Sequence, residues 1–226
     1  MRHAVVTGAS SGIGEAIARR LLAHAWRVTG LDRAPPVIGE PAFEPVRVEL
    51  TDRTARAAAL SQLADVTAIV HAAGLMRVGA LGALDAHDGE TLWQLHVDCA
   101  SALADALAPG LPAGGRIVLI GSLSSRGVAG RSQYAASKAA LVALARSWAA
   151  ELIQRGITVN VIAPAATATA MLADPARSAV APVVPPIGRL IRPDEVAALT
   201  AFLLSEEAAA ITGQEIFICG GATLRT

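Results

Sequence analysis

Short apolar runs alternate along this chain with longer alanine-rich segments of helical period. Runs rich in valine and isoleucine predict strands near residues 3–7, 27–31, 46–50, 67–71, 115–121, 157–163 and 214–219. The alanine-rich segments predict helices near residues 12–24, 53–64, 88–108, 132–155 and 194–205. Strands that alternate with helices in this way are typical of a parallel sheet covered on both faces. We therefore expect a single α/β domain over residues 1–226, a doubly wound parallel sheet of about seven strands with helices on both faces.

Two proline-rich segments interrupt this alternation. Residues 34–45 (APPVIGEPAFEP) lie where a crossover helix belongs, and their four prolines argue against one. Residues 172–189 (LADPARSAVAPVVPPIGR) predict a long apolar loop of the kind that often covers a site. Helices and strands resume after each segment, so neither marks a domain boundary.

Composition excludes several classes of partner. The 226 residues are 53% hydrophobic and carry a formal net charge of zero, with no block of basic residues. We therefore expect neither nucleic acid nor a membrane surface as a partner. No apolar stretch approaches the ~18 residues of a membrane span, and the short run that ends at Gly8 is not a secretory signal.

Cysteine and histidine usage bears on the redox state of the protein and on metal binding. Cys99 and Cys219 fit reduced thiols in a cytoplasmic protein better than a disulfide framework. The five histidines lack the spacing of metal ligands, so we expect no metal.

The first chemical motif is VVTGASSGIG, residues 5–14, in which a predicted strand meets a glycine-rich turn and then a helix. Glycines 8, 12 and 14 let the backbone approach a pyrophosphate, which the free N–H groups of a helix N-terminus bind. The spacing GxxxGxG differs from the more general GxGxxG, and a turn without a ligand is the alternative.

Asp32 lies about 20 residues beyond these glycines, at the end of the second predicted strand. An acid at this place bonds a ribose 2′-hydroxyl and repels a 2′-phosphate, which favours NAD over NADP. Arg33 is the counter-argument, because its guanidinium can bind a 2′-phosphate. A solvated turn residue is the alternative for Asp32.

The segment YAASK, residues 134–138, contains both the only tyrosine and the only lysine of the chain. Tyr134 and Lys138 lie at i and i+4 of the helix predicted over 132–155, so they share one face. A positive charge at about 4 Å in an effective dielectric of about 20 is worth ~4 kcal/mol. That energy lowers a phenol pKa by roughly three units, towards 7. The pair therefore suggests a tyrosine that exchanges protons at neutral pH.

Five residues of chemical interest each fall at the end of a different predicted strand. Parallel strands bring their carboxyl ends to one edge of the sheet, where ligands bind. The five residues expected on this shared rim are Gly8, Asp32, His71, Ser122 and Pro164.

Taken together, these segments resemble the short-chain dehydrogenase/reductases, especially those like 3-oxoacyl-(acyl-carrier-protein) reductase. The resemblance covers nearly the whole chain, with TGASSGIG (7–14), HAAG (71–74), GGRIVLIGS (114–122), YAASK (134–138), GITVNVIAPAATATAM (156–171), PIGRLIRPDEVA (186–197) and ITGQEIFICGG (211–221) in one order. It implies a Rossmann-like fold and hydride transfer between NAD, or NADP, and a secondary alcohol or ketone.

The resemblance also implies roles for single residues. The family's general acid/base falls on Tyr134, its lysine on Lys138, and its serine, which bonds the substrate oxygen, on Ser122. The cofactor-binding positions implied are Gly8, Ser10, Ser11, Gly12, Ile13, Gly14, Asp32, Arg33, Glu49, Leu50, His71, Ala72, Ala73, Gly74, Tyr134, Lys138, Pro164, Thr167 and Thr169.

Several positions depart from the family pattern. His71 replaces an asparagine, either as a hydrogen-bonded structural residue or as a change in the pocket floor. His96 falls where the family has a helix asparagine whose backbone carbonyl holds a water beside the lysine, and Asp98 is a competing alignment. We include His96 among the catalytic candidates on this ground. Ser122 precedes Tyr134 by one residue fewer than is commonest, which leaves Ser124 and Ser125 as alternatives.

Partners and substrate are less constrained. Helices 88–108 and 132–155 carry many small residues and form a dimer or tetramer core in the family, although such residues also pack against their own sheet. The loop 172–189 favours a small or medium apolar alcohol or ketone. A non-catalytic NAD-binding regulator remains an alternative function, and a methyltransferase-like fold has no use for the tyrosine–lysine pair.

Overall fold

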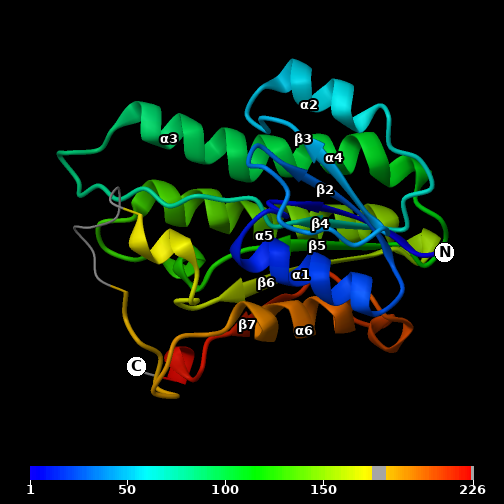
Figure 1. The fold of residues 1–226 in the computed structure, drawn as a ribbon. Coiled ribbons are helices and arrows are strands. Elements are labelled where there is room, and N and C mark those ends of the chain that lie inside the picture. The colour runs from blue at the N-terminus through cyan, green and yellow to red at the C-terminus, as the bar shows by residue number, and fades with distance from the viewer. Residues whose placement is uncertain (175–181, 225–226) are drawn as a thin grey trace.

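The computed structural model describes residues 1–174 and 182–224, so part of the loop predicted over 172–189 lies outside the described residues. Seven parallel strands in this part of the chain form one sheet, in the order β3-β2-β1-β4-β5-β6-β7 (Figure 1). The strands are β1 (His3–Thr7), β2 (Arg27–Asp32), β3 (Phe43–Arg47), β4 (Ala68–His71), β5 (Arg116–Ile120), β6 (Thr158–Pro164) and β7 (Glu215–Ile218). The helices are α1 (Gly12–Ala23), α2 (Arg53–Leu60), α3 (Ala86–Trp93), α4 (Cys99–Leu107), α5 (Ser132–Leu152) and α6 (Pro193–Leu203). The predicted doubly wound α/β fold is confirmed.

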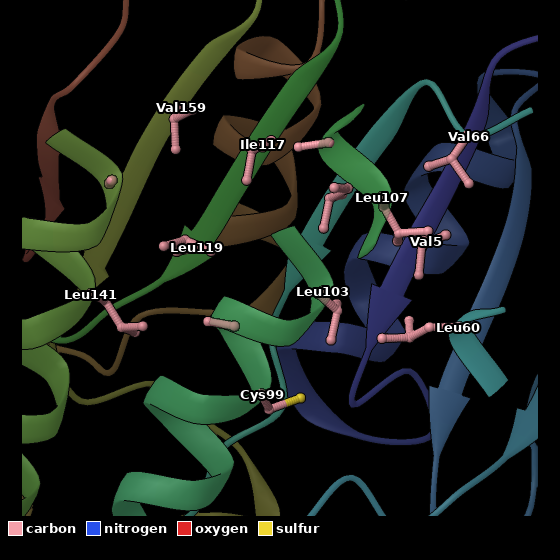
Figure 2. Close-up of a cluster of buried hydrophobic side chains, with 14 of the residues drawn as sticks. Val5, Leu60, Val66, Cys99, Leu103, Leu107, Ile117, Leu119, Leu141 and Val159 are labelled. Carbon is pink, nitrogen blue, oxygen red and sulfur yellow. The ribbon is translucent and has the colours of Figure 1, made fainter. Parts of the chain in front are cut away.

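Strand side chains alternate between two helix-covered faces, because successive residues of a strand point to opposite sides. Val5 of β1 and Ile117 of β5 pack with α2, α4 and α5, in the cluster drawn in Figure 2. Val6 and Val118, the next residue on each strand, pack with α1 and α6 on the other face. Both faces are therefore apolar, which explains why the strands read as continuous valine and isoleucine runs.

The helix predicted over 88–108 is interrupted. A π-helical turn, Gln94–Asp98, separates α3 from α4. Such a turn inserts an extra residue into the helix and re-aims the side chains around it. It places His96 inward, with none of its surface exposed, while Asp98 pairs at the surface with Arg53 at 2.6 Å.

The connection from β2 to β3 contains no helix in the structure, as the prolines of residues 34–45 predict. The strand itself was wrongly placed by the apolar pattern: it runs from Phe43 to Arg47 instead of near 46–50. Pro45 lies inside it, opposite Gly30 of β2. β3 is an edge strand, where a residue without an N–H is tolerated.

None of the helices among the described residues combines the length and the hydropathy needed to cross a membrane. Residues 1–174 and 182–224 also hold no cluster of three or more His, Cys, Asp or Glu side chains that could bind a metal ion. Cys99 and Cys219 are both buried free thiols.

Candidate active site

A cavity of about 450 Å³ opens at the carboxyl ends of the strands. It gathers residues from the glycine turn, the segments after β4, β5 and β6, and helix α5. The predicted site residues that line it are Gly8, Ser11, Gly12, Ile13, Gly14, Ala72, Ala73, Gly74, Ser122, Tyr134, Lys138, Pro164, Thr167 and Thr169. Ser10, Asp32, Arg33, Glu49, Leu50, His71 and His96 are not part of its lining.

The glycine turn is shaped for a close backbone approach. Gly8 has a φ of +70°, and a Cβ on it would lie 2.9 Å from the Cα of Ala73. A Cβ on Gly14 would collide with the carbonyl oxygen of Gly8. Helix α1 begins directly after this turn, and the Ser11 side chain caps no N–H of the described residues. The first-turn N–H groups are therefore available to an anion.

The charge of the cavity lining also suits an anion. Its described lining contains the cations Arg131 and Lys138 and no aspartate or glutamate. The cradle of glycine backbone and helix N-terminus, in a lining without described carboxylates, fits the pyrophosphate of a dinucleotide.

Asp32 lies beside this cradle, at the end of β2. Its two carboxylate oxygens accept N–H bonds from Ser10 and Ala34, each at 2.9 Å. Arg33 next to it is directed towards Glu49, at 3.6 Å between nitrogen and carboxylate oxygen. The acid is thus fixed against the glycine turn, while the neighbouring guanidinium is balanced by a second acid.

Tyr134 and Lys138 lie one turn apart on α5, and both line the cavity. Both are almost fully buried, at 5% and 4% exposure. The Lys138 ammonium donates to the carbonyl of Ile120 at 2.9 Å. Burial lowers the pKa of Lys138 to about 7. Its charge is therefore costly before any ligand binds, so the three-unit effect expected on the phenol is an upper bound in the free protein.

The surroundings of Ser122, Ser124 and Ser125 distinguish these three candidates for the serine that bonds the substrate oxygen. Ser122 follows β5, lines the cavity, and accepts the N–H of Ser124 at 3.1 Å. Ser125 is directed away, since its hydroxyl donates to Glu215 at 2.7 Å. Ser124 lines the cavity as well, but Ser122 lies nearer the strand end, as the rim argument predicts.

His71 and His96, the two histidines that depart from the family pattern, lie beneath the cavity. His71 has none of its surface exposed, and its Nδ1 is 3.0 Å from Oγ1 of Thr7. This favours the structural interpretation over a change in the pocket floor. His96 packs edge-on against the Tyr134 ring, with 5.7 Å between ring centroids. Of the two competing positions in the helix, His96 and not Asp98 therefore faces the tyrosine.

The sequence predicted only part of the cavity's outer wall. Met76, Val128 and Met171 line it, together with residues 182–186 and Arg131. Residues 182–186 belong to the apolar loop that the sequence predicts over a site, and Met171 lies in one of the family-like segments. Met76, Val128 and Arg131 carried no such signal, because the fold alone brings them to the wall.

Comparisons with known proteins agree with this geometry. A family model described as enoyl-(acyl carrier protein) reductase matches residues 8–223. The 3-oxoacyl-(acyl-carrier-protein) reductase of Escherichia coli K12 is 34% identical over 236 residues, which cover 96% of both chains. A short chain dehydrogenase family protein from Francisella tularensis superposes with a TM-score of 0.91 at 26% identity, over all of both chains. This chain belongs to the short-chain dehydrogenase/reductase family.

A solved structure extends this conclusion to the cofactor. A short chain dehydrogenase from Burkholderia cenocepacia, in complex with NADP, is 32% identical, with a TM-score of 0.84 over 98% of both chains. As a short-chain dehydrogenase/reductase, the protein is an NAD(P)-dependent oxidoreductase that transfers hydride between the nicotinamide and an alcohol or ketone. The predicted family, fold and reaction class are confirmed.

Proposed function

We propose that this enzyme interconverts a secondary alcohol and the corresponding ketone, with Tyr134 as the general acid/base. The observation that carries the proposal is the placement of Tyr134 and Lys138 on the wall of the same cavity as the glycine turn. When bound, the nicotinamide accepts or supplies the hydride. The chain's own residues must then hold the substrate oxygen and move one proton.

The three polar groups divide this work. In alcohol oxidation the Tyr134 oxygen takes the hydroxyl proton, and in ketone reduction it returns that proton to the new alkoxide. Lys138 places a positive charge one helical turn away, which favours the phenolate. Ser122 donates a hydrogen bond to the substrate oxygen as charge develops there.

The cofactor choice follows from the end of β2. We propose that NAD is preferred, because the Asp32 carboxylate is fixed beside the glycine turn and repels a 2′-phosphate. Arg33, the residue able to bind such a phosphate, is engaged by Glu49. Among the cofactor residues implied by the family, we propose that His71 acts from below, by supporting Ala72 and Ala73.

The outer wall of the cavity bears on the substrate. Met76, Val128, Met171, Leu172 and residues 182–186 are apolar and surround the approach to Tyr134. This lining supports a substrate whose carbonyl or hydroxyl is attached to an apolar body.

We also propose that the chain assembles as a homodimer or homotetramer through α4 and α5. Trp93, at the end of α3 and 48% exposed, is a large apolar side chain beside the predicted interface. Analytical ultracentrifugation of the wild type and Trp93→Glu tests this, with a loss of assembly expected in the variant. The cytoplasmic location stays a prediction.

One experiment tests the catalytic proposal. A panel of secondary alcohols and ketones is assayed with NAD(H) and NADP(H) at the absorbance of the reduced nicotinamide, with the wild type and Tyr134→Phe. We expect kcat to fall by about 10²–10⁴-fold in the variant, with the reduced cofactor still bound. Equal turnover by both proteins would refute the assignment of the base. Tight cofactor binding without turnover of any substrate would favour the regulatory alternative.

A further inference from the structure

His96 joins three parts of the site through hydrogen bonds whose direction follows from one backbone donor. The backbone N–H of Leu75 donates to His96 Nε2 at 3.2 Å, so Nε2 carries no proton. Nδ1 must then carry it, and Nδ1 lies 2.9 Å from Oγ of Ser137, which accepts it. The Ser137 hydroxyl in turn donates to the carbonyl of Tyr134 at 2.9 Å. The chain of donors therefore runs from the segment after β4, through His96, into the first turns of α5.

We propose that His96 and Ser137 are positioning residues that fix the catalytic turn of α5 against the cavity floor. The proposal rests on the proposed role of Tyr134. It concerns how Tyr134 is held and assigns no reacting atom to either residue.

Packing around the imidazole leaves it one orientation. His96 and Ser137 have none of their surface exposed. A Cβ on Gly74 would lie 3.1 Å from His96 Nε2, so a side chain there would crowd the ring. The Tyr134 ring stands at 78° to the imidazole. A shift of His96 would therefore disturb the Tyr134 ring that packs against it.

The same contacts argue against His96 as a proton carrier. Its Nε2 lone pair and its Nδ1 proton are both engaged. Burial, with the nearby charge of Lys138 and the neighbouring His71, keeps the pKa of His96 well below its usual value. The ring is neutral across the working pH range. A group that moved protons would have to break one of its two bonds in each cycle.

Variants test the hydrogen bonds of the two His96 ring nitrogens separately. His96→Gln places an amide oxygen near the Nε2 site and loses the donor to Ser137. His96→Asn reaches only the Nδ1 site and loses the acceptor for Leu75. Ser137→Ala removes the middle of the chain with little change in volume. Ser61→Ala, which removes a hydroxyl-to-carbonyl bond of the same kind at an exposed position outside α4 and α5, is the matched control.

The first measurement needs no substrate. Nitrogen-15 NMR of the full chain, with the His96 signals assigned by their loss in His96→Gln, reports the tautomer directly. We expect a protonated Nδ1, an unprotonated Nε2 and no titration between about pH 8.5 and 5.5. The opposite tautomer, or titration near the usual histidine pKa, would overturn the proposal. A protein without turnover would refute the proposed function and still leave this result decisive.

The second measurement uses a substrate found with the alcohol and ketone panel. We expect kcat to fall about tenfold in Ser137→Ala and His96→Gln, with no further loss in the double variant. The dissociation constant of the reduced cofactor and the pH limbs of kcat should match those of Ser61→Ala. An unchanged kcat with only a lower melting temperature would show that both residues stabilise the fold and do not position Tyr134. Loss of a pH limb in His96→Gln would make His96 a proton carrier.

Discussion

Thr7 of β1 and His71 of β4 are hydrogen-bonded beneath the cavity, with 3.0 Å between Oγ1 and Nδ1. The Thr7 hydroxyl oxygen also accepts the N–H groups of Ala72 and Ala73, each at 3.0 Å. Its own proton is therefore directed to Nδ1, and His71 accepts where His96 donates. The bond ties two adjacent strands to the segment that forms the floor of the site.

Burial of His71 makes the fold sensitive to acid. The pKa of His71 is lowered from 6.5 to about 3, first by burial and then by the charge of Lys138. Below pH 6.5 the unfolded chain takes up a proton that the folded protein refuses, so stability falls as the pH drops from 6.5 towards 3. Each pH unit in this window costs about 1.4 kcal/mol.

We expect His71→Asn to remove that share of the acid sensitivity. Urea unfolding at several pH values between 7.5 and 4.5 gives the slope, which should decrease by about 1.4 kcal/mol per pH unit relative to the wild type. His87→Asn, at an exposed position, is the control and should leave the slope unchanged. An identical slope in His71→Asn would contradict the assignment.

Lys138 has an effect of the same sign at higher pH. Its folded pKa of about 7 is lower than its usual value of 10.5, so between these values only the unfolded chain keeps the proton. Stability therefore rises with pH from about 7 upwards, by up to ~1.4 kcal/mol per unit. Lys138→Met should flatten the unfolding free energy between pH 7 and 9. A rise of equal size in the variant would show that another group titrates there.

The glycine turn predicts a steric effect on cofactor binding. In Gly14→Ala the new methyl group collides with the carbonyl of Gly8, which must move away from the cradle. We expect the affinity for the reduced cofactor, measured by its fluorescence, to fall at least about tenfold. Gly39→Ala meets no atom within 4 Å and serves as the control. Equal affinities would separate the turn from the cofactor site.

Glu49 bears on cofactor selectivity. Its second carboxylate oxygen accepts two bonds from Thr51, which fixes the group opposite Arg33. Removal of this charge in Glu49→Gln releases Arg33, and we expect KM for NADP to fall about two- to fivefold relative to that for NAD. Glu44→Gln breaks a comparable surface pair, Arg27–Glu44, and should leave the ratio of the two KM values unchanged. A lower KM for NADP relative to NAD in both variants would point to the overall charge of the protein and not to the Arg33–Glu49 pair.

Much of the fold could be predicted because its signals are local. A parallel sheet buried on both faces gives apolar strand runs, and six of the seven strands lie within one or two residues of the predicted ranges. The third strand was misplaced because apolar content favoured Val46 to Leu50, while pairing with β2 selects Phe43 to Arg47. Phe43 fits there because its ring lies against Gly30, a contact between distant segments.

In the site, too, short-range patterns could be predicted and contacts between distant residues could not. The glycine turn and the tyrosine–lysine pair are short-range patterns, and the structure brings both to one cavity. The π-helical turn that directs His96 inward has no signature in composition or periodicity. The partnership of His96 with Ser137 joins residues 41 positions apart, so neither could be recognised before the helices were packed.

The proline in β3 has a consequence for how copies of this chain can associate. An open sheet presents unpaired peptide groups at both margins, and an incoming strand from another molecule can extend it there. Pro45 offers no N–H, and the charged Glu44 and Arg47 flank the same margin. Continuous sheets across two subunits are thus disfavoured on this side and confined to the margin formed by β7.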